Sequence, residues 1–336
     1  MKKISFLIPC YNEEESLPRL YAELAGFTAS KATVRVTGDA GETLEQTLDM
    51  SGYEWEFLMV NDGSRDSTLD RLEELRSRDD RVSVLNLSRN FGKENAMLAG
   101  MDYFSGDALI IIDADLQDPL SVVPEMIYWW EKGYDDVYGR RLSRGKESRL
   151  RKAMSLQFYK IMQRTSNIDV LPNVGDFRLL DRRAVRAIIS LRESQRYTKG
   201  LFCWVGFRKK GVDYARADRQ AGKSSFNFKS LVNLAIEGIV GYSTMPLRVS
   251  TAVGIIVSLL AFIYLVVIIV KTLIWGEPVA GFPTLMCVIL FLGGMQLLAL
   301  GIIGEYIGRI FNETKNRPPY IVESFNGTTP QNSATE

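Results

Sequence analysis

Two long stretches without a charged residue constrain this chain more than any other feature. Residues 249–270 and 281–304 contain no Asp, Glu, Lys or Arg. As helices rising about 1.5 Å per residue, both are long enough to cross the roughly 30 Å hydrocarbon core of a bilayer. The sequence therefore predicts two transmembrane helices joined by residues 271–280 as a tight hairpin. Two buried core helices are the alternative, but core helices rarely run uncharged for so long.

The basic residues around these stretches predict their orientation. Arg248 precedes the first stretch, and Arg309, Lys315 and Arg317 follow the second, whereas Lys271 is the one basic residue of the connecting loop. Cytoplasmic segments of membrane proteins carry an excess of Lys and Arg. We therefore expect a multi-pass protein of the cytoplasmic (inner) membrane with both termini in the cytoplasm.

The segments that flank the hairpin are also assigned from composition. Residues 226–248 mix aromatic, aliphatic and basic side chains at helical spacing, which predicts juxtamembrane amphipathic helices. Ordinary helices packed on the soluble part show the same periodicity and are the alternative. Residues 305–336 are expected to form a cytoplasmic tail.

Ahead of residue 226, short apolar runs alternate with amphipathic stretches. This alternation predicts an α/β domain, over residues 1–225, with a mostly parallel sheet covered by helices on both faces. The first two expected strands are much further apart than a crossover requires, so residues 29–52 are interpreted as a surface insertion. Strands are expected at residues 4–8, 56–60, 82–87, 108–112 and 136–139, and helices at 13–25, 66–78, 93–104 and 121–132.

Polar motifs follow three of the expected strands. Residues 9–13 (Pro-Cys-Tyr-Asn-Glu) follow the first, Asp62 lies in an Asn-Asp-Gly-Ser turn after the second, and residues 113–119 (Asp-Ala-Asp-Leu-Gln-Asp-Pro) follow the fourth. Ligands of such sheets bind outside the carboxyl ends of the strands, so we expect these turns to meet at one edge. A purely structural turn is the alternative for Asp62, because Asp-Gly favours turns.

The third motif has the composition of a metal site. Asp113, Asp115 and Gln117 are spaced two apart after an apolar strand, so their side chains can point the same way. Hard oxygen ligands of this kind suit Mg²⁺ or Mn²⁺ bridging a diphosphate. A lone Asp-x-Asp is weak evidence, and its position after a buried strand strengthens it.

A basic run follows the fifth expected strand. Solvated surface charge is the usual meaning of such a run, but its first member begins at the edge where the metal motif lies, and guanidinium groups bind phosphate well. We expect Arg140, with Arg149 or Arg151, to bind a phosphate group. The full run is Arg140, Arg141, Arg144, Lys146, Arg149, Arg151 and Lys152.

Composition excludes several classes of function. The chain contains no histidine, which excludes Ser-His-Asp and Cys-His mechanisms and histidine-bound zinc. Its 41 basic and 40 acidic residues nearly cancel, whereas a nucleic-acid-binding domain is normally strongly basic. The three cysteines lack metal-ligand spacing and suit a reducing cytosol.

These motifs, in this order, resemble the family 2 glycosyltransferases of the nucleotide-diphospho-sugar transferase (GT-A) fold. The resemblance runs from Ile4 to about Tyr320 and is strongest to the bacterial bactoprenol (undecaprenyl phosphate) glucosyltransferases, polyprenyl-phosphate enzymes related to dolichyl-phosphate mannose synthases. It rests on residues 113–119 together with 90–94 (Asn-Phe-Gly-Lys-Glu), 173–179 (Asn-Val-Gly-Asp-Phe-Arg-Leu) and 304–309 (Gly-Glu-Tyr-Ile-Gly-Arg).

The resemblance implies roles for individual residues. Asp176 would be the carboxylate nearest the reacting centre, acting with Asp115 and Arg140. A structural ion pair with Arg178 or a neighbour is the alternative for it. Relatives usually carry a Lys six residues after Arg219, where Ser225 stands here, so Lys223 is the candidate to replace it. The implied nucleotide-sugar-binding residues are Pro9, Tyr11, Glu13, Asp62, Lys93, Asp113, Ala114, Arg219 and Lys223; the metal ligands are Asp113, Asp115 and Gln117; the acceptor-phosphate ligands are Arg140, Arg149 and Arg151.

The implied reaction is transfer of a hexose to undecaprenyl or another polyprenyl phosphate, with inversion, for modification of cell-surface glycans such as lipopolysaccharide or cell wall. UDP-glucose is the first choice of donor and UDP-N-acetylglucosamine the second. A processive polysaccharide synthase is disfavoured because Gln195, Arg196 and Tyr197 do not form its Gln-x-x-Arg-Trp motif. A membrane scaffold that binds a nucleotide is the non-enzyme alternative, and a homo-oligomer is expected as a further partner interaction.

Overall fold

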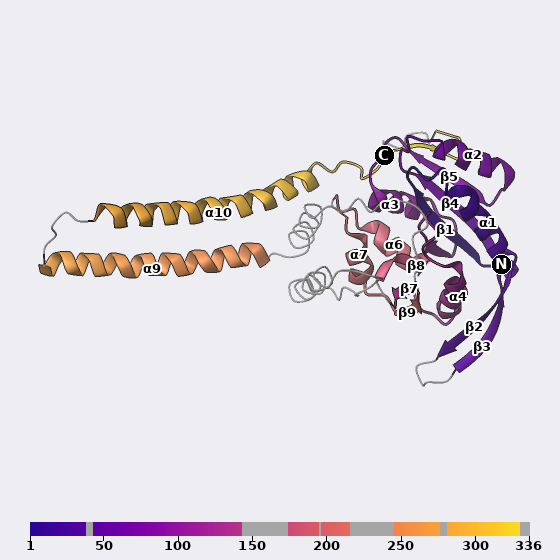
Figure 1. The fold of residues 1–336 in the computed structure, drawn as a ribbon, viewed down its shortest axis with the longest axis horizontal. Helices are drawn as coiled ribbons and strands as arrows, with labels where there is room; N and C mark the ends of the chain where they lie inside the picture. The colour runs from indigo at the N-terminus through magenta and orange to yellow at the C-terminus, as the bar shows by residue number, and fades with distance from the viewer. Residues whose placement is uncertain (38–42, 143–173, 195, 216–244, 276–280, 330–336) are drawn as a thin grey trace. The chain divides into compact units, whose positions relative to one another are not determined.

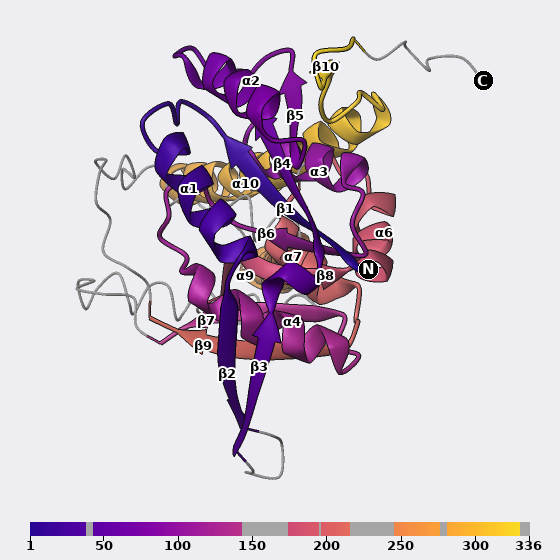
Figure 2. The same ribbon diagram turned by 90° about the vertical axis from the view of Figure 1, so that its right-hand side faces the viewer.

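The computed structural model describes residues 1–37, 43–142, 174–194, 196–215, 245–275 and 281–329. The chain divides into two compact units. The first contains the sheet domain and the C-terminal segment from Pro318 onward, and the second contains two long helices that precede that segment. Figures 1 and 2 show the elements of both units.

An eight-stranded sheet forms the centre of the first unit, in the order β10-β5-β4-β1-β6-β8-β7-β9. Pairing is parallel between β1 and both β4 and β6, between β4 and β5, and between β7 and β9. Strand β8 runs antiparallel to β6 and β7, and β10 runs antiparallel to β5. The predicted α/β class with a mostly parallel sheet is confirmed. The strands are β1 (Lys3–Cys10), β4 (Glu54–Asn61), β5 (Val82–Leu87), β6 (Ala108–Ile111), β7 (Asp136–Arg141), β8 (Val174–Asp181), β9 (Lys209–Tyr214) and β10 (Val322–Phe325).

Helices cover both faces of this sheet. Alternation along β1 sends Phe6 and Ile8 into one core and Leu7 into the other. The first core is shared with α1 (Leu17–Thr28), α2 (Thr68–Arg78) and α4 (Val123–Glu131), which follows the short helix η2 (Leu120–Val122). The second is shared with α3 (Lys93–Tyr103), α6 (Arg182–Ser190) and α7 (Thr198–Trp204). Because the sheet is buried on both sides, its central strands are almost continuously apolar.

Residues between α1 and β4 form an antiparallel pair outside the main sheet. Strands β2 (Lys31–Thr37) and β3 (Thr43–Asp49) make up this pair, and η1 (Met50–Gly52) leads from it into β4. Val34, Val36 and Leu48 are buried in the first core, so one face of the pair packs on the domain. The stretch interpreted as an insertion therefore has a regular structure of its own.

Two strands of the sheet, β8 and β9, were not among the expected strands. Strand β8 lies between β6 and β7, so the fourth and fifth expected strands are not neighbours. Strand β9 then pairs with the outer edge of β7. Apolar runs did not reveal β8 because Asp176 and Arg178 interrupt it, and both side chains have polar partners in the fold.

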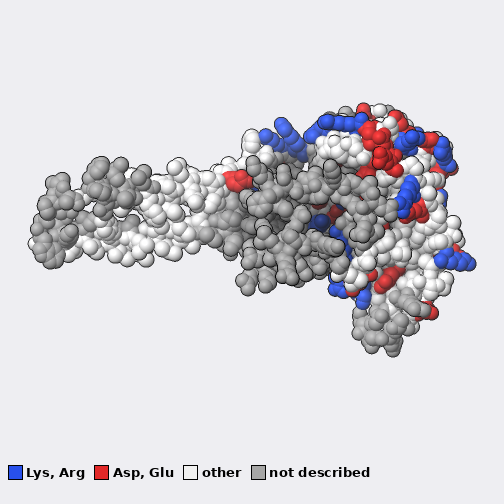
Figure 3. All heavy atoms as spheres, in the orientation of Figure 1, with Lys and Arg blue, Asp and Glu red and all other residues white. Residues whose placement is uncertain are grey.

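The second unit contains α9 (Met245–Trp275) and α10 (Phe282–Thr314), two helices in contact with each other. Residues 249–270 lie inside α9, and residues 282–304 lie inside α10. Large apolar side chains such as Ile255, Phe262, Phe291 and Leu297 are more than half exposed. On the face drawn in Figure 3, the described atoms of the hairpin are predominantly uncharged.

The two hairpin helices differ in how long their apolar segments are. Among the described residues, one segment, Phe291–Thr314, is long and apolar enough for this. Ser250–Tyr264 is a shorter apolar segment. Part of the second predicted span, from Phe291 onward, therefore belongs to a segment that is long and apolar enough to cross a membrane. Within the described residues, the first predicted span does not.

Candidate active site

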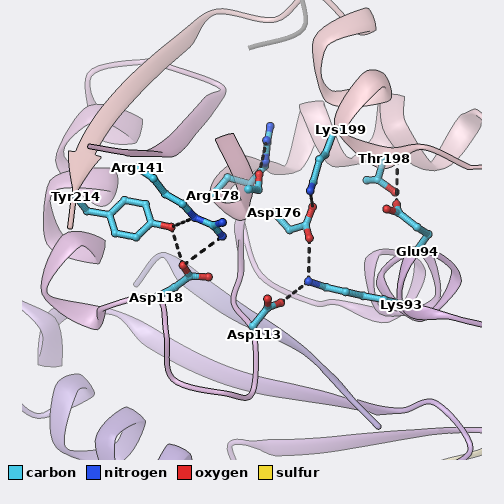
Figure 4. Close-up of polar contacts among 11 residues, drawn as sticks. Lys93, Glu94, Asp113, Asp118, Arg141, Asp176, Arg178, Thr198, Lys199 and Tyr214 are labelled. Carbon is cyan, nitrogen blue, oxygen red and sulfur yellow. Dashed lines mark hydrogen bonds and ion pairs between the residues drawn. The ribbon is translucent and has the colours of Figure 1, made fainter. Parts of the chain in front are cut away.

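Lys93 is at the centre of the polar cluster at the carboxyl ends of the strands. It is the first residue of α3, and its ammonium nitrogen lies 2.6 Å from Asp113 Oδ1 and 2.8 Å from Asp176 Oδ2. Figure 4 shows Lys93 between the two carboxylates. Burial lowers the pKa of Lys93, but the charges of Asp113 and Asp176 and their hydrogen bonds outweigh it and raise the pKa above its ordinary value. Lys93 is therefore a permanent cation that joins β6 to β8.

Asp176 is held as a carboxylate by several cations. Burial alone would raise its pKa, but Lys199, Lys93 and Arg178 lower it below the ordinary value. Lys199 Nζ lies 4.0 Å from Asp176 Oδ1. Helix α7, which carries Lys199, is fixed to α3 because Glu94 accepts a hydrogen bond from the Thr198 N–H at 3.0 Å. Asp176 is therefore an ionised, largely buried group and a poor proton donor.

Asp176 forms ion pairs with its neighbours Lys93 and Lys199, as one form of the structural alternative expects, whereas Arg178 pairs with another acid. Arg178 donates to Asp136 at 3.1 Å and to the Gly175 carbonyl at 3.1 Å, and its guanidinium lies over the Phe202 ring. Both charged side chains of this pair are 3% exposed or less. Arg178 therefore stabilises the β7–β8 pairing, whereas the ion pairs of Asp176 are formed with Lys93 and Lys199.

Three acidic side chains of the site, Glu13, Asp113 and Asp115, lie close enough for their charges to interact. Burial raises the pKa of Glu13, and the charges of Asp115 and Asp113 raise it further. Asp115 also accepts the Gln117 backbone N–H at 3.2 Å, and the Gln117 side chain is buried. Within the described residues, no three Cys, Asp or Glu side chains converge as a complete metal cage. Two carboxylates are nevertheless what Mg²⁺ takes from a protein when substrate phosphates supply further ligands, so this donor set fits a divalent cation.

The motif loop is fixed to the edge of the sheet by Asp118. Its carboxylate accepts the Tyr214 hydroxyl at 2.6 Å, and the Tyr214 hydroxyl accepts a hydrogen bond from Arg141 Nε at 3.1 Å. Burial first, and then Asp118, raise the pKa of Tyr214 to about 12. Arg141 is partly buried, and its guanidinium lies 4.0 Å from Asp118 and close enough to Asp113 to feel its charge. The arginine that reaches the metal motif is therefore Arg141.

Arg140 has a different position from the one expected. Successive residues of a strand face opposite sides, and Arg140 points to the exposed side, where it forms two hydrogen bonds with its register partner Asp213 at 2.5 and 2.8 Å. In this position the guanidinium of Arg140 is paired with Asp213. Its binding of an acceptor phosphate stays a prediction.

Asp62 has structural partners for both carboxylate oxygens. They accept the backbone N–H groups of Phe91 at 2.7 Å and Gly92 at 3.0 Å, and the residue is 3% exposed. Burial raises the pKa of Asp62, and these hydrogen bonds oppose the rise. Asp62 therefore fixes the turn that leads into Lys93, which is the structural alternative given above, and contact with a nucleotide stays a prediction.

The other expected site residues fall into two groups. Pro9 lies one residue before the end of β1, and Tyr11 follows the strand and is exposed. Ala114 is buried between the two motif aspartates. Arg149, Arg151, Arg219 and Lys223 lie outside the described residues. Sequence reasoning did not single out Arg141 or Lys199 as site residues. No local pattern shows that β7 pairs with β9 or that α7 approaches β8.

The family was established by comparison with known proteins. The model of glycosyl transferase family 2 matches residues 5–189, and that of the GtrB C-terminal hairpin matches residues 245–310. The first match covers more than half of the chain and includes Lys93, Asp113 and Asp176. The chain belongs to glycosyl transferase family 2. The sheet domain is thus a glycosyltransferase domain, and the two helices after it are the hairpin of the second family.

Relatives of this glycosyltransferase match along nearly its whole length. The SfII prophage-derived bactoprenol glucosyl transferase of Shigella flexneri is 42% identical over 98% of this chain and 100% of its own. The putative glycosyltransferase CsbB of Bacillus subtilis is 41% identical over 96% of this chain and 92% of its own. Among solved structures, glucosyl-3-phosphoglycerate synthase from Mycobacterium tuberculosis matches 71% of this chain and 78% of its own, with 17% identity and a TM-score of 0.43.

Proposed function

We propose that this glycosyltransferase transfers glucose from UDP-glucose to a polyprenyl phosphate, with inversion at the anomeric carbon. The observation that carries the proposal is the 42% identity to a bactoprenol glucosyl transferase along 98% of the chain. The aligned length includes the cluster around Lys93 and both hairpin helices. The choice of glucose and of a polyprenyl lipid comes from the name of that relative. The polar cluster around Lys93 contains charged groups suited to sugar transfer.

The acceptor needs no strong base. A phosphate monoester has a second pKa near 6, so at neutral pH its oxygen is already anionic and can attack the anomeric carbon. A bond forms between this oxygen and the carbon as the bond to the diphosphate breaks, and UDP leaves. Asp176, held ionised by its cations, would orient the acceptor or stabilise positive charge on the carbon. The absence of histidine from the sequence is no obstacle.

Asp113 and Asp115, with Gln117, are proposed to hold Mg²⁺ or Mn²⁺ against the diphosphate. When bound, the cation would neutralise charge that develops on the leaving nucleoside diphosphate. Lys93 fixes the position of Asp113 through the 2.6 Å contact. Asp118 and Tyr214 fix the far end of the same loop. Together they would keep the metal-binding carboxylates in place before substrates arrive.

Arg141 is proposed as an arginine of the phosphate-binding side of the site. Its guanidinium lies beside the metal motif, and a planar guanidinium can bind a phosphate with two hydrogen bonds. Arg140, Arg149 and Arg151 remain candidates for the acceptor phosphate, and Arg219 and Lys223 remain candidates for the diphosphate.

The two hairpin helices are proposed to span the inner membrane, with both termini in the cytoplasm. The support is the number of exposed apolar side chains on α9 and α10, which a two-helix hairpin has no means to bury in water. The acceptor lipid would lie in the same membrane. A single cysteine introduced at residue 278, in the loop, should react only with reagents outside the cell, whereas one at residue 316 should react only from inside.

The proposed reaction can be tested with purified full-length protein in detergent. Radiolabelled UDP-glucose and undecaprenyl phosphate should give an organic-extractable product that disappears with a chelator and returns with Mg²⁺ or Mn²⁺. Undecaprenol without its phosphate is the matched control and should give no product. A product from UDP-N-acetylglucosamine alone would change the sugar, a polymer would indicate a synthase, and no product with any common nucleotide sugar would contradict the proposal.

A further inference from the structure

Three polar side chains form a row across neighbouring strands at the edge of the sheet. Asn61 ends β4, Asn86 is its register partner on β5, and Glu323 lies on β10, the C-terminal strand. Asn61 Nδ2 donates to Asn86 Oδ1 at 2.8 Å, and Asn86 Nδ2 donates to Glu323 Oε2 at 2.9 Å. Both asparagines are 5% exposed or less, so neither can replace these partners with water.

Glu323 determines the direction of every hydrogen bond in this row. An ionised carboxylate accepts hydrogen bonds and cannot donate them. It therefore holds the Asn86 amide with the NH₂ group toward β10 and the oxygen toward β4. Asn61 must then turn its own NH₂ group to Asn86, which leaves Asn61 Oδ1 to accept the Ser64 N–H at 3.3 Å. A reversed amide at Asn61 would place two donors face to face at Ser64.

Ser64 connects the two turns that carry Tyr11, Glu13 and Asp62, which are expected to bind the nucleotide. Its hydroxyl accepts the Asn12 N–H at 3.0 Å, and Asn12 Oδ1 accepts the Arg65 N–H at 2.9 Å. Asn12 has φ 55°, a left-handed conformation that a non-glycine residue adopts mainly where local hydrogen bonds support it. The row that starts at Glu323 thus ends in the turn formed by residues 9–13.

Glu323 is held firmly enough for this purpose. The Ile321 carbonyl accepts the Ser88 N–H at 3.0 Å on one side of it. On the other side, Asn326 forms two hydrogen bonds with the Val84 backbone, both at 2.8 Å, and the ring of Phe325 lies 5.0 Å from that of Tyr103. Strand β10 is therefore fixed at both ends of Glu323.

We propose that Glu323 is a positioning residue for the nucleotide sugar. By fixing the Asn86 and Asn61 amides, it shapes the turn at Ser64 and, through Asn12, the neighbouring turn. The C-terminal segment that follows the hairpin is then part of the donor site, although it touches neither the sugar nor the phosphates. This inference rests on the proposed function in one respect, namely that these turns bind the UDP part of the donor.

Three variants of the full-length protein test the direction of the row. Glu323→Ala removes the acceptor, Glu323→Gln keeps an acceptor oxygen without the charge, and Glu323→Lys places a donor opposite the Asn86 NH₂ group. Glu323 is exposed, so none of them should prevent folding, which thermal unfolding would check. Ser324→Ala on the same strand is the control. UDP affinity is measured by titration calorimetry, and KM for both substrates and kcat by transfer.

Loss of one such hydrogen bond should weaken UDP binding about three- to tenfold in Glu323→Ala and raise KM for the donor equally. Glu323→Lys should lose at least as much, while Glu323→Gln and Ser324→Ala stay near wild type and KM for the lipid is unchanged. Equal losses in Glu323→Ala and Glu323→Gln, or wild-type UDP affinity in Glu323→Lys, would overturn the proposal. Failure of the wild-type protein to bind UDP would instead contradict the proposed function.

Discussion

The ammonium nitrogen of Lys93 lies 2.8 Å from a carboxylate oxygen of Asp176, although 83 positions separate the two residues in the chain. The same nitrogen contacts Asp113. Without this cation, two carboxylates from different strands would face each other in a partly buried site, where like charges strongly disfavour joint ionisation. Lys93 therefore makes the arrangement of Asp113 and Asp176 stable before any ligand binds.

Replacing Lys93 with Ala should lower kcat by about a hundredfold or more, because charge-stabilising groups at reacting centres have effects of this size. Lys93→Arg keeps the charge and should lose less. Steady-state transfer assays measure both variants, with UDP affinity as a second readout. A Lys93→Ala enzyme with kcat near wild type would show that the bridge between Asp113 and Asp176 is dispensable.

Arg141→Ala and Arg140→Ala form a matched pair on one strand. Arg141 lies by the metal motif and Arg140 is paired with exposed Asp213. Arg141→Ala should therefore raise KM for the lipid phosphate or lower kcat by about tenfold or more, since hydrogen bonds to charged groups contribute about 1.5–3 kcal/mol. Arg140→Ala should change both by less than about threefold as long as Arg140 stays paired with Asp213. The reverse order would mean that Arg140 leaves Asp213 to bind the phosphate.

Asp115→Asn should abolish measurable transfer and leave folding intact, because it removes a metal-binding charge and no core contact. Binding of Mn²⁺, followed by electron paramagnetic resonance in the presence of UDP, should weaken in parallel. Asp80→Asn, at an exposed position after α2, is the control and should behave as wild type. Retained activity with unchanged Mn²⁺ binding would remove Asp115 from the metal site.

Arg178→Met should destabilise the fold by about 3–5 kcal/mol, because it leaves the buried charge of Asp136 without its partner. Arg183→Met is the matched control: Arg183 also pairs with an aspartate, but its side chain is 72% exposed, and the melting temperature of this variant should stay near that of wild type. Thermal unfolding of the detergent-purified protein compares the two. Similar melting temperatures would mean that the Arg178–Asp136 pair is not needed for stability.

Local sequence patterns predicted the strands and turns that neighbouring residues determine by themselves. Apolar runs revealed β1, β4, β5 and β6, and Asp113 and Asp115 follow β6 as expected, while metal binding by them stays a prediction. Patterns failed where a residue's partner is distant in sequence. Strand β8 carries Asp176 and Arg178 in place of apolar residues, and Arg178 pairs with Asp136, 42 positions earlier. The ion pair of Arg140 with Asp213 was not foreseen, because only the register between β7 and β9 brings these two residues together.

Strand β10 is made after both hairpin helices, yet it covers the edge of β5, which an exposed strand would otherwise offer to other chains. Synthesis must pass through both hairpin helices before this edge can close. Until β10 pairs, the sheet has an uncovered edge at β5. A chain that stops after α10 would keep Lys93, Asp113 and Asp176 but would offer that edge to strands of other chains.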